Sequence, residues 1–230
     1  MTGYRWLLFD ADNTLFDFDA AEEFAITRTL LHYGLPADEE SKGRYRAVNA
    51  ALWASFDRGE IDQEKLVVER FARFLEGEGR QGDPAEWNRA YLDRLAEGSV
   101  LLPGAEALCR ALAERYDLAL VTNGVPYVQR RRLEASPLAP LFGERVYISG
   151  ELGCRKPERI YFEKVLDGLG AEPWEALVIG DSLSSDIQGA ANAGLDSIWY
   201  NPRGKRNIPG TARPTYEVPG FDRLAELLGV

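Results

Sequence analysis

The chain has 230 residues, 45% of them hydrophobic, which is enough to bury a full core in one domain or in a domain that carries an insert. Its formal net charge of −10 argues against nucleic acid or an anionic membrane as a main partner, although a local cation and a metal could still hold a phosphorylated small molecule. It has neither an apolar run long enough to cross a bilayer nor a basic segment followed by an apolar one, so we expect no membrane segment and no secretory signal.

The first predicted element is a buried strand at residues 4–9, and two aspartates follow it directly. Asp10 and Asp12 are two positions apart, so their side chains would leave an extended chain on the same face. In an open α/β sheet, ligands bind beyond the carboxyl ends of the strands, where both acids would lie. The alternative for this stretch alone is an Asp-Asn turn whose side chains cap their own backbone.

Residues 19–98 contain no strand-like run, and their apolar residues recur every three or four positions. The clearest stripe consists of Tyr45, Val48, Leu52 and Phe56. Turn-forming glycines and prolines divide the segment into four predicted helices. We therefore expect a helical bundle, the cap domain, at residues 19–98, inserted into an α/β core domain made of residues 1–18 and 99–230.

From residue 99 onward, strand-like and helical segments alternate. Strands are predicted at residues 118–121, 146–149, 176–180 and, as the last strand, 197–200. Pro157 fits the first turn of one intervening helix, Gly194 fits the end of another, and residues 201–214 have the composition of a loop. A last helix is predicted at residues 221–228. This alternation predicts a doubly wound α/β fold, in which a parallel sheet is covered by helices on both faces.

Side chains that can carry chemistry follow the ends of separate predicted strands. They are Asp10 with Asp12, Thr122, Lys156 and Asp181. Because the carboxyl ends of parallel strands converge on one crevice, we expect these side chains to meet there. His32 is the only histidine, which excludes a histidine-based triad and a zinc site of several histidines and leaves carboxylate chemistry.

This set of residues fits phosphoryl transfer through a covalent intermediate. Asp10 would be the nucleophile that forms an aspartyl-phosphate, and Asp12 would protonate the leaving oxygen and then take a proton from the hydrolytic water. Mg²⁺ held by Asp10, the backbone carbonyl of Asp12 and Asp181 would offset the repulsion between phosphate and carboxylate.

The phosphoryl oxygens also need partners from the protein. Thr122 and backbone N–H groups near Asn123 and Gly124 would bind them, and Lys156 would balance their charge in the transition state. Asp186 would hold Lys156 or a metal-bound water.

The same residues carry a resemblance to a known family. The motifs are Asp10-x-Asp12-x-Thr14, Thr122-Asn123-Gly124, Lys156-Pro157 and Gly180-Asp181-(x)4-Asp186. Together and in this order they resemble the four motifs of the haloacid dehalogenase superfamily, and the insert resembles its helical type-1 cap. The resemblance implies a Rossmann-like core, Mg²⁺ dependence and the roles given above, with Thr14 and Asp186 supporting the catalytic acids.

The superfamily contains several kinds of enzyme. Its dehalogenases lack the second aspartate of the first motif, because a halide leaving group needs no proton whereas an alkoxide does. Asp12 therefore indicates a phosphate ester as substrate. A sugar phosphomutase would keep both aspartates, and a non-catalytic binding module that kept the fold is a further alternative.

Outside the motifs, residues 9–19, 47–62 and 148–157 resemble bacterial pyrimidine 5′-nucleotidases of the house-cleaning type. This resemblance implies hydrolysis of pyrimidine and non-standard nucleoside monophosphates, with phosphoglycolate or a sugar phosphate as the alternative substrate. The only cysteines, Cys109 and Cys154, fit a reducing cytoplasm better than a disulfide framework, and Cys109 is expected to be buried. We expect a cytoplasmic monomer or dimer.

Candidates for a substrate pocket are Phe16, Phe18, Trp53 and Arg70, and each has a structural alternative. Trp53 would stack on a nucleobase or belong to the cap core, and the two phenylalanines would border the pocket or pack the cap against the core domain. Arg70 would line the cleft or extend along its stem into solvent, which is the interpretation we favour. The run 130–132, three arginines, is predicted to be a solvated helix face.

Overall fold

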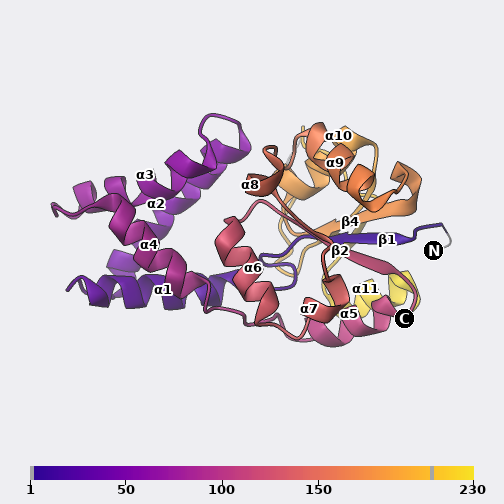
Figure 1. The fold of residues 1–230 in the computed structure, drawn as a ribbon, viewed down its shortest axis with the longest axis horizontal. Coiled ribbons are helices and arrows are strands. Elements are labelled where there is room, and N and C mark those ends of the chain that lie inside the picture. Colours follow the sequence, from indigo (N-terminus) through magenta and orange to yellow (C-terminus); the bar gives the residue numbers. More distant parts are fainter. Residues whose placement is uncertain (1–2, 208–209) are drawn as a thin grey trace. The chain divides into compact units, whose positions relative to one another are not determined.

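The computed structural model describes residues 3–207 and 210–230 (Figure 1). The chain divides into two compact units, one formed by Met1–Asp17 with Ser99–Val230 and the other by Phe18–Gly98. We call them the sheet unit and the helical unit.

The sheet unit is built on parallel strands. These are β1 (Trp6–Phe9), β2 (Asp117–Thr122), β3 (Val146–Ile148), β4 (Ala176–Gly180), β5 (Asp196–Tyr200) and β6 (Tyr216–Val218). Over the described part of the chain they form one sheet in the order β3-β2-β1-β4-β5-β6, with every neighbouring pair parallel. In the central register Phe9 lies opposite Leu120 and Ile179, so β1, β2 and β4 end near the same edge of the sheet.

The connecting segments of the sheet unit are mostly helical. They are α5 (Ala105–Ala113), α6 (Pro126–Glu134), α7 (Ala139–Phe142), α8 (Ser149–Leu152), α9 (Arg159–Leu169), the 3-10 turn η1 (Pro173–Glu175), the π-helical turn η2 (Leu183–Ile187), α10 (Gln188–Ala193) and α11 (Phe221–Leu228). Gly194 ends α10 with φ of 72°, as predicted from the sequence.

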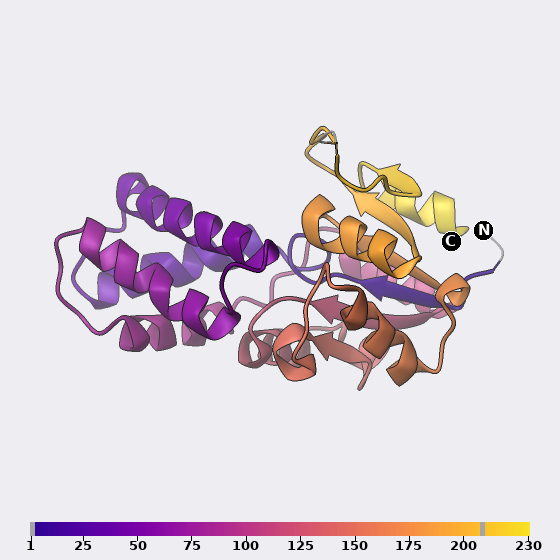
Figure 2. The same ribbon diagram turned by 90° about the horizontal axis from the view of Figure 1, so that it is seen from above.

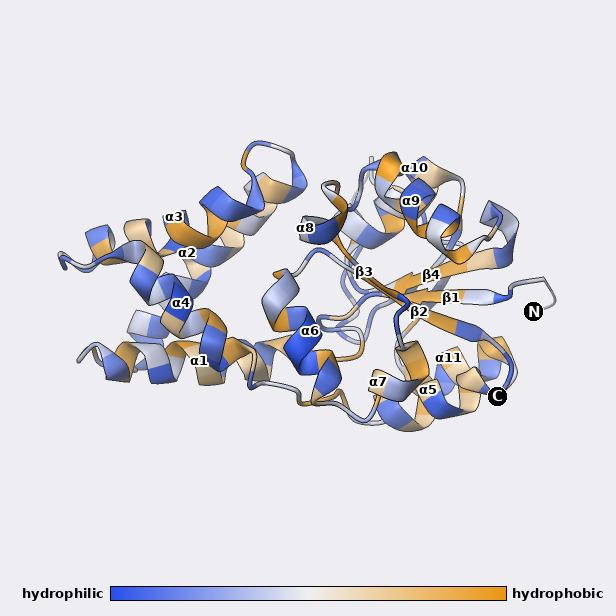
Figure 3. Cartoon of the chain, viewed as in Figure 1, coloured by the Kyte–Doolittle hydropathy of each residue, from blue (hydrophilic) through white to orange (hydrophobic). Residues whose placement is uncertain are grey.

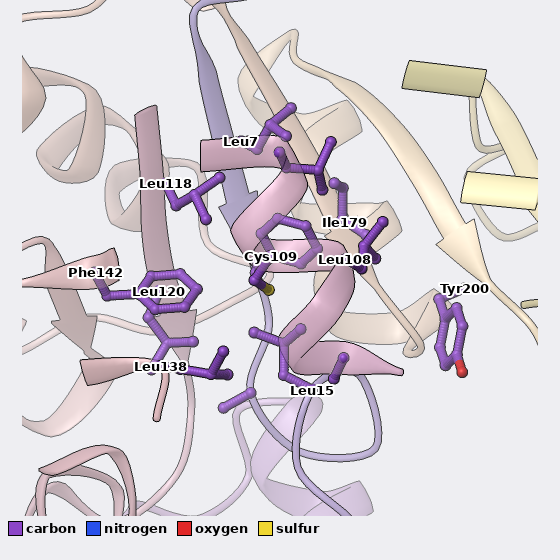
Figure 4. Close-up of a cluster of buried hydrophobic side chains, with 14 of the residues drawn as sticks. Leu7, Leu15, Leu108, Cys109, Leu118, Leu120, Leu138, Phe142, Ile179 and Tyr200 are labelled. Carbon is purple, nitrogen blue, oxygen red and sulfur yellow. The ribbon is translucent and has the colours of Figure 1, made fainter. Parts of the chain in front are cut away.

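The two faces of the sheet bury separate clusters, because successive side chains of a strand point to opposite sides. Leu7 and Phe9 pack with residues of α5, α7 and α11, among them Leu108 and Cys109 (Figure 4). Trp6 and Leu8 pack with residues of α9 and α10 on the other face. The strands are accordingly apolar along most of their length (Figure 3). Helices on both faces of a parallel sheet confirm the predicted doubly wound α/β fold, and Cys109 is buried as expected.

The helical unit contains α1 (Phe18–His32), α2 (Glu39–Asp57), α3 (Gln63–Gly77) and α4 (Pro84–Leu95), all within fully described residues (Figure 2). Aspartates 38, 62 and 83 begin the last three helices, since each side chain accepts a hydrogen bond from a backbone N–H of the first turn. Tyr45, Phe71 and Tyr91 pack against one another in the middle. Nowhere in residues 3–207 and 210–230 does a helix combine the length and apolarity of a membrane span.

Three local predictions in the sheet unit are wrong. Residues 197–200 are not the last strand, because β6 follows; only Val218 of its three residues is buried, so it lacks an apolar run. Ser149 begins α8 and does not extend β3. Pro157 precedes α9, which starts at Arg159, so it is not in the first helical turn.

Candidate active site

Asp10 follows β1 directly and is almost completely buried, with 7% of its surface exposed. Its backbone N–H donates to the Ile179 carbonyl of β4, which extends the strand pairing by one residue. The chain then turns sharply at Asn13, whose φ of 59° lies in the left-handed region that asparagine tolerates. This turn brings Thr14 back over Asp10 so that its hydroxyl donates to Asp10 Oδ2 at 3.2 Å.

Thr14 also connects this loop to the one after β4. Its Oγ1 accepts a hydrogen bond of 3.1 Å from the backbone N–H of Asp181. The indole of Trp199, on β5, donates to the Asp181 carbonyl at 2.9 Å. Asp10 and Asp181 are therefore held beside each other by backbone and side-chain bonds from both loops.

Lys156 is the central cation of the site, with 1% of its surface exposed. Its ammonium donates to Asp10 Oδ1 at 2.7 Å, to Asp186 Oδ1 at 2.6 Å and to the Val121 carbonyl at 2.9 Å, so all three hydrogens have acceptors. Asn123 fixes its backbone, donating to the Lys156 carbonyl at 2.8 Å and accepting from its N–H at 3.0 Å. The Asn123 side chain thus serves to position Lys156.

The buried charges shift one another's proton affinities. Burial raises the pKa of Asp10 to about 7, although Lys156 pulls it down. Burial, and then the charge of Asp10, raises the pKa of Asp181 to about 6. Burial alone would lower the pKa of Lys156, but the carboxylates of Asp10 and Asp186 outweigh it and raise that pKa. Lys156 is therefore a permanent cation at neutral pH.

Asp10, Asp181 and Asp186 each offer a carboxylate oxygen, and these oxygens lie within 4.8 Å of one another. Asp10 and Asp186 share the buried Lys156 ammonium, and Asp181 has the half-exposed Lys205 ammonium at 3.3 Å. Three carboxylates with two cations leave room for further positive charge, and their hard oxygen donors suit Mg²⁺. Asp186 is fully buried, whereas Asp10 keeps 7% of its surface exposed and Asp181 keeps 21% of its side chain exposed. Asp10 and Asp181 are therefore the side chains that a metal ion could reach.

The Asp12 side chain is engaged elsewhere. Arg132 of α6 donates to Asp12 Oδ1 at 2.5 Å, and Gln129 of the same helix donates to Asp12 Oδ2 at 2.5 Å. A metal role for Asp12 would therefore fall to its backbone carbonyl, as predicted from the sequence.

The prediction that residues 130–132 form a solvated helix face is wrong for Arg132, which is fully buried. Its guanidinium lies 4.8 Å from the ring centre of Phe16, and the ion pair with Asp12 offsets part of the cost of burying the charge. A signal was present in the sequence, because Arg132 lies between Val128 and Leu133 on the buried face of α6.

Thr122 ends β2 with 1% of its surface exposed. Its hydroxyl oxygen accepts hydrogen bonds from the Gly124 N–H at 3.0 Å and from the Gln129 side chain at 3.2 Å. The Gly124 N–H, expected to bind phosphate, is thus used within the loop. Gln129 is not among the site residues predicted from the sequence.

The four pocket candidates lie in different surroundings. Phe16 is buried in the sheet-unit core and forms backbone bridges to Asp12 and Leu101. Trp53 is half-buried and meets the Phe56 ring edge-on at 5.4 Å in the helical unit. Phe18, also half-buried, begins α1. A substrate-binding role for these residues stays a prediction.

The interpretation that Arg70 extends into solvent is wrong, since only 2% of its surface is exposed. Inside the helical unit its guanidinium donates to Asn88 Oδ1 at 2.6 Å and to Asn49 Oδ1 at 3.4 Å and lies 4.5 Å from the ring centre of Tyr91. These polar partners make burial of the charge tolerable.

Comparison with known proteins identifies the family. The model of haloacid dehalogenase-like hydrolases matches residues 4–194. The chain belongs to this family. This hydrolase is 40% identical to the pyrimidine 5′-nucleotidase PynA of Streptococcus pneumoniae, over 98% of this chain and 95% of PynA. It is 34% identical to the pyrimidine 5′-nucleotidase YjjG of Escherichia coli, over 98% of both chains.

The hydrolase also resembles a solved structure over its whole length. The crystal structure of the HAD-hydrolase YfnB from Bacillus subtilis, bound to magnesium, superposes with a TM-score of 0.93 at 36% identity and full coverage of both chains. The family resemblance inferred from the four motifs is thereby confirmed.

Proposed function

We propose that this hydrolase is a Mg²⁺-dependent phosphomonoesterase that acts on pyrimidine nucleoside 5′-monophosphates through an aspartyl-phosphate. The observation that carries the proposal is the buried Asp10 carboxylate, bonded to Lys156 and grouped with Asp181 and Asp186. A nucleophile in such a setting needs cations to approach a phosphate, and the cluster combines one fixed cation with oxygen donors for another.

In the first step an Asp10 carboxylate oxygen attacks phosphorus, and the bond to the ester oxygen breaks with its electron pair. Asp12 gives its proton to that oxygen, so the alcohol leaves neutral. In the second step Asp12 takes a proton from water as the water oxygen attacks the same phosphorus. The bond between phosphorus and the Asp10 oxygen then breaks, which releases inorganic phosphate and restores the Asp10 carboxylate.

The surrounding groups stabilise the charge on the transferring phosphoryl group. Lys156 lies against Asp10 and would face the phosphoryl oxygens, and the Thr122 hydroxyl and the Asn123 N–H would donate to them. Asp10, Asp181 and the Asp12 carbonyl would hold Mg²⁺, which supplies a positive charge shared between carboxylate and phosphate. The magnesium bound to YfnB supports this choice of metal.

The substrate class rests on the relatives. PynA and YjjG are both named pyrimidine 5′-nucleotidases, and each aligns with nearly the whole of this chain. Asp12 supports an ester over a halide, since an alkoxide leaving group needs a proton.

Phosphate release from a panel of esters tests the proposal. The panel sets uridine and thymidine monophosphates beside purine nucleotides, sugar phosphates and phosphoglycolate, with and without Mg²⁺. We expect Mg²⁺-dependent release, fastest from pyrimidine nucleotides and abolished in Asp10→Asn. Preference for sugar phosphates or phosphoglycolate would overturn the substrate class and keep the mechanism. Halide release from haloacids without phosphatase activity would overturn both.

A further inference from the structure

Gln129 bonds two of the groups that the proposed reaction uses, although it belongs to none of the four motifs. We propose that Gln129 is a positioning residue whose amide group fixes the Asp12 carboxylate and directs the Thr122 hydroxyl toward phosphate. This inference rests on the proposed function, which gives Asp12 and Thr122 their roles.

The contacts of Gln129 are buried and short. The side chain has 2% of its surface exposed, and its Nε2 lies 2.5 Å from Asp12 Oδ2 and 3.2 Å from Thr122 Oγ1. An amide NH₂ carries two hydrogens, one for each of these acceptors. A single side chain from α6 therefore links the loop after β1 to the end of β2.

The orientation of the amide follows from its neighbours. If nitrogen and oxygen were exchanged, the amide oxygen would lie 2.5 Å from a carboxylate oxygen, and the two would repel. Within the described part of the chain, Gln129 Oε1 has no hydrogen-bond partner, so nothing favours the reversed orientation.

The bond from Gln129 determines what the Thr122 hydroxyl can do. A hydroxyl oxygen accepts two hydrogen bonds through its lone pairs and donates one. Gly124 N–H and Gln129 Nε2 occupy both accepting positions. The hydroxyl hydrogen is left to donate to a third group, which in the proposed reaction is a phosphoryl oxygen.

At Asp12, Gln129 acts together with Arg132. Each carboxylate oxygen accepts one hydrogen bond at 2.5 Å, from Arg132 on Oδ1 and from Gln129 on Oδ2. Two bonds on different oxygens fix the rotation of the carboxylate plane, which one bond would leave free. Holding a proton-transfer group in one geometry speeds the reaction, because misplacement of the reacting atoms raises the activation barrier.

The fold makes room for this arrangement at Gly124. A Cβ built there would lie 2.0 Å from Gln129 Nε2 and 2.6 Å from its Cδ, so any other residue would displace the amide. The glycine of the Thr122-Asn123-Gly124 motif is thus required for the Gln129 amide to occupy this position.

Gln129→Met tests the proposal because it keeps the length and removes the amide. We expect kcat to fall at least about tenfold and the Ki for inorganic phosphate to rise about three- to tenfold, the change that losing one hydrogen bond makes. The Ki is then measured in Thr122→Val and in the double variant. In the Thr122→Val background Gln129→Met should leave Ki unchanged, while the kcat loss through Asp12 persists.

Arg131→Met is the matched control, since it alters the exposed side of α6 without contacting Asp12 or Thr122. It should match the wild type in kcat and Ki. Gln129→Asn keeps the amide but is one methylene shorter, and it should lose as much as Gln129→Met; it serves as the test if the methionine variant does not fold.

The outcomes separate this inference from the proposed function. A Ki that rises equally with and without the Thr122 hydroxyl would show that Gln129 only packs the helix, and the inference would fall. Unchanged kcat and Ki in both Gln129 variants would overturn it too. In either case phosphatase activity of the wild type leaves the proposed function intact. If the wild-type enzyme released phosphate from no ester, the proposed function and the inference would fall together.

Discussion

The fully buried Arg132 forms an ion pair with Asp12, the proposed acid/base. Arg132→Met should lower kcat at least about tenfold, because the carboxylate loses the partner that fixes Oδ1, and should lower the free energy of unfolding by about 1–3 kcal/mol. Steady-state kinetics and urea unfolding measure the two effects. Arg131→Met, on the exposed side of the same helix, should stay within about 0.5 kcal/mol of the wild type. If Arg132→Met kept the wild-type kcat, Arg132 would have no role in positioning Asp12 for catalysis.

Lys205 brings a second cation to the carboxylate cluster. Its ammonium lies 3.3 Å from Asp181 Oδ2, and the buried Asn201 side chain fixes its backbone by bonding both its N–H and its carbonyl. The positive charge of Lys205 repels a metal ion bound to Asp181, so the Lys205→Met variant should bind Mg²⁺ about two- to fivefold more tightly. The effect is small because an ion pair with a half-exposed partner contributes little energy.

Isothermal titration with Mg²⁺ measures that change. The difference should shrink at high salt, because the ammonium is half exposed and its field is screened. Lys164→Met removes an equal charge from the exposed side of α9 and should leave the dissociation constant unchanged. Equal tightening in both variants would mean that net charge alone is responsible.

At the scale of elements, close packing between α9 and α10 depends on a glycine. A Cβ on Gly189 would lie 2.5 Å from the Phe162 ring and 3.1 Å from the Pro157 Cα, so Gly189→Ala should destabilise the protein by about 1–3 kcal/mol. Gly43, inside α2, has no atom within 4 Å of such a Cβ, and Gly43→Ala should stabilise by about 0.5–1 kcal/mol. Urea unfolding measures the free energy of unfolding of both variants. If Gly43→Ala destabilised the protein as much as Gly189→Ala, close packing at Gly189 would not be the cause.

The order of the elements could be predicted from the sequence because each central strand is a continuous apolar run. Such runs arise where both faces of a parallel sheet are covered, and β1, β2 and β4 lie at the centre. β6 at the edge has one buried residue, and α7 and α8 are single turns, so periodicity had too few positions to detect them.

The positions of Asp10 and Asp181 could be predicted because each directly follows a strand, and these strands end at one edge of the sheet. The spacing of Arg132 with Val128 and Leu133 was a signal for its burial. The bonds that Arg132 and Gln129 make could not be predicted, because only tertiary contacts show what a buried polar side chain bonds. The same holds for Arg70, which is buried by partners on two other helices.

For the molecule as a whole, stability should depend on pH through a half-buried carboxyl in the helical unit, that of Glu22. Burial raises the pKa of Glu22 above its ordinary value, although the Asn49 hydrogen bond lowers it. The folded state therefore holds this proton more tightly than the unfolded chain, and stability falls as pH rises from the ordinary glutamate range through the raised folded-state pKa.

Glu22→Gln removes the ionisable group, so stability is no longer lost at this position as pH rises. The glutamine keeps a side-chain oxygen that can accept the hydrogen bond from Asn49. It should be more stable than the wild type at neutral pH, with the difference closing below the ordinary pKa of glutamate. Thermal unfolding across pH measures it, with Glu64→Gln, an exposed change on α3, as the control. If Glu22→Gln were less stable than the wild type at neutral pH, ionised Glu22 would stabilise the folded state and the prediction would be wrong.

In the proposed mechanism the phosphoryl group is transferred to Asp10. The most direct measurement is acid quench of the enzyme during hydrolysis of uridine monophosphate carrying labelled phosphorus, followed by mapping of the labelled peptide. We predict a hydroxylamine-sensitive label on Asp10, present with Mg²⁺ and absent in Asp10→Asn. Rapid phosphate release with no labelled protein, or continued release by Asp10→Asn, would contradict an aspartyl-phosphate intermediate.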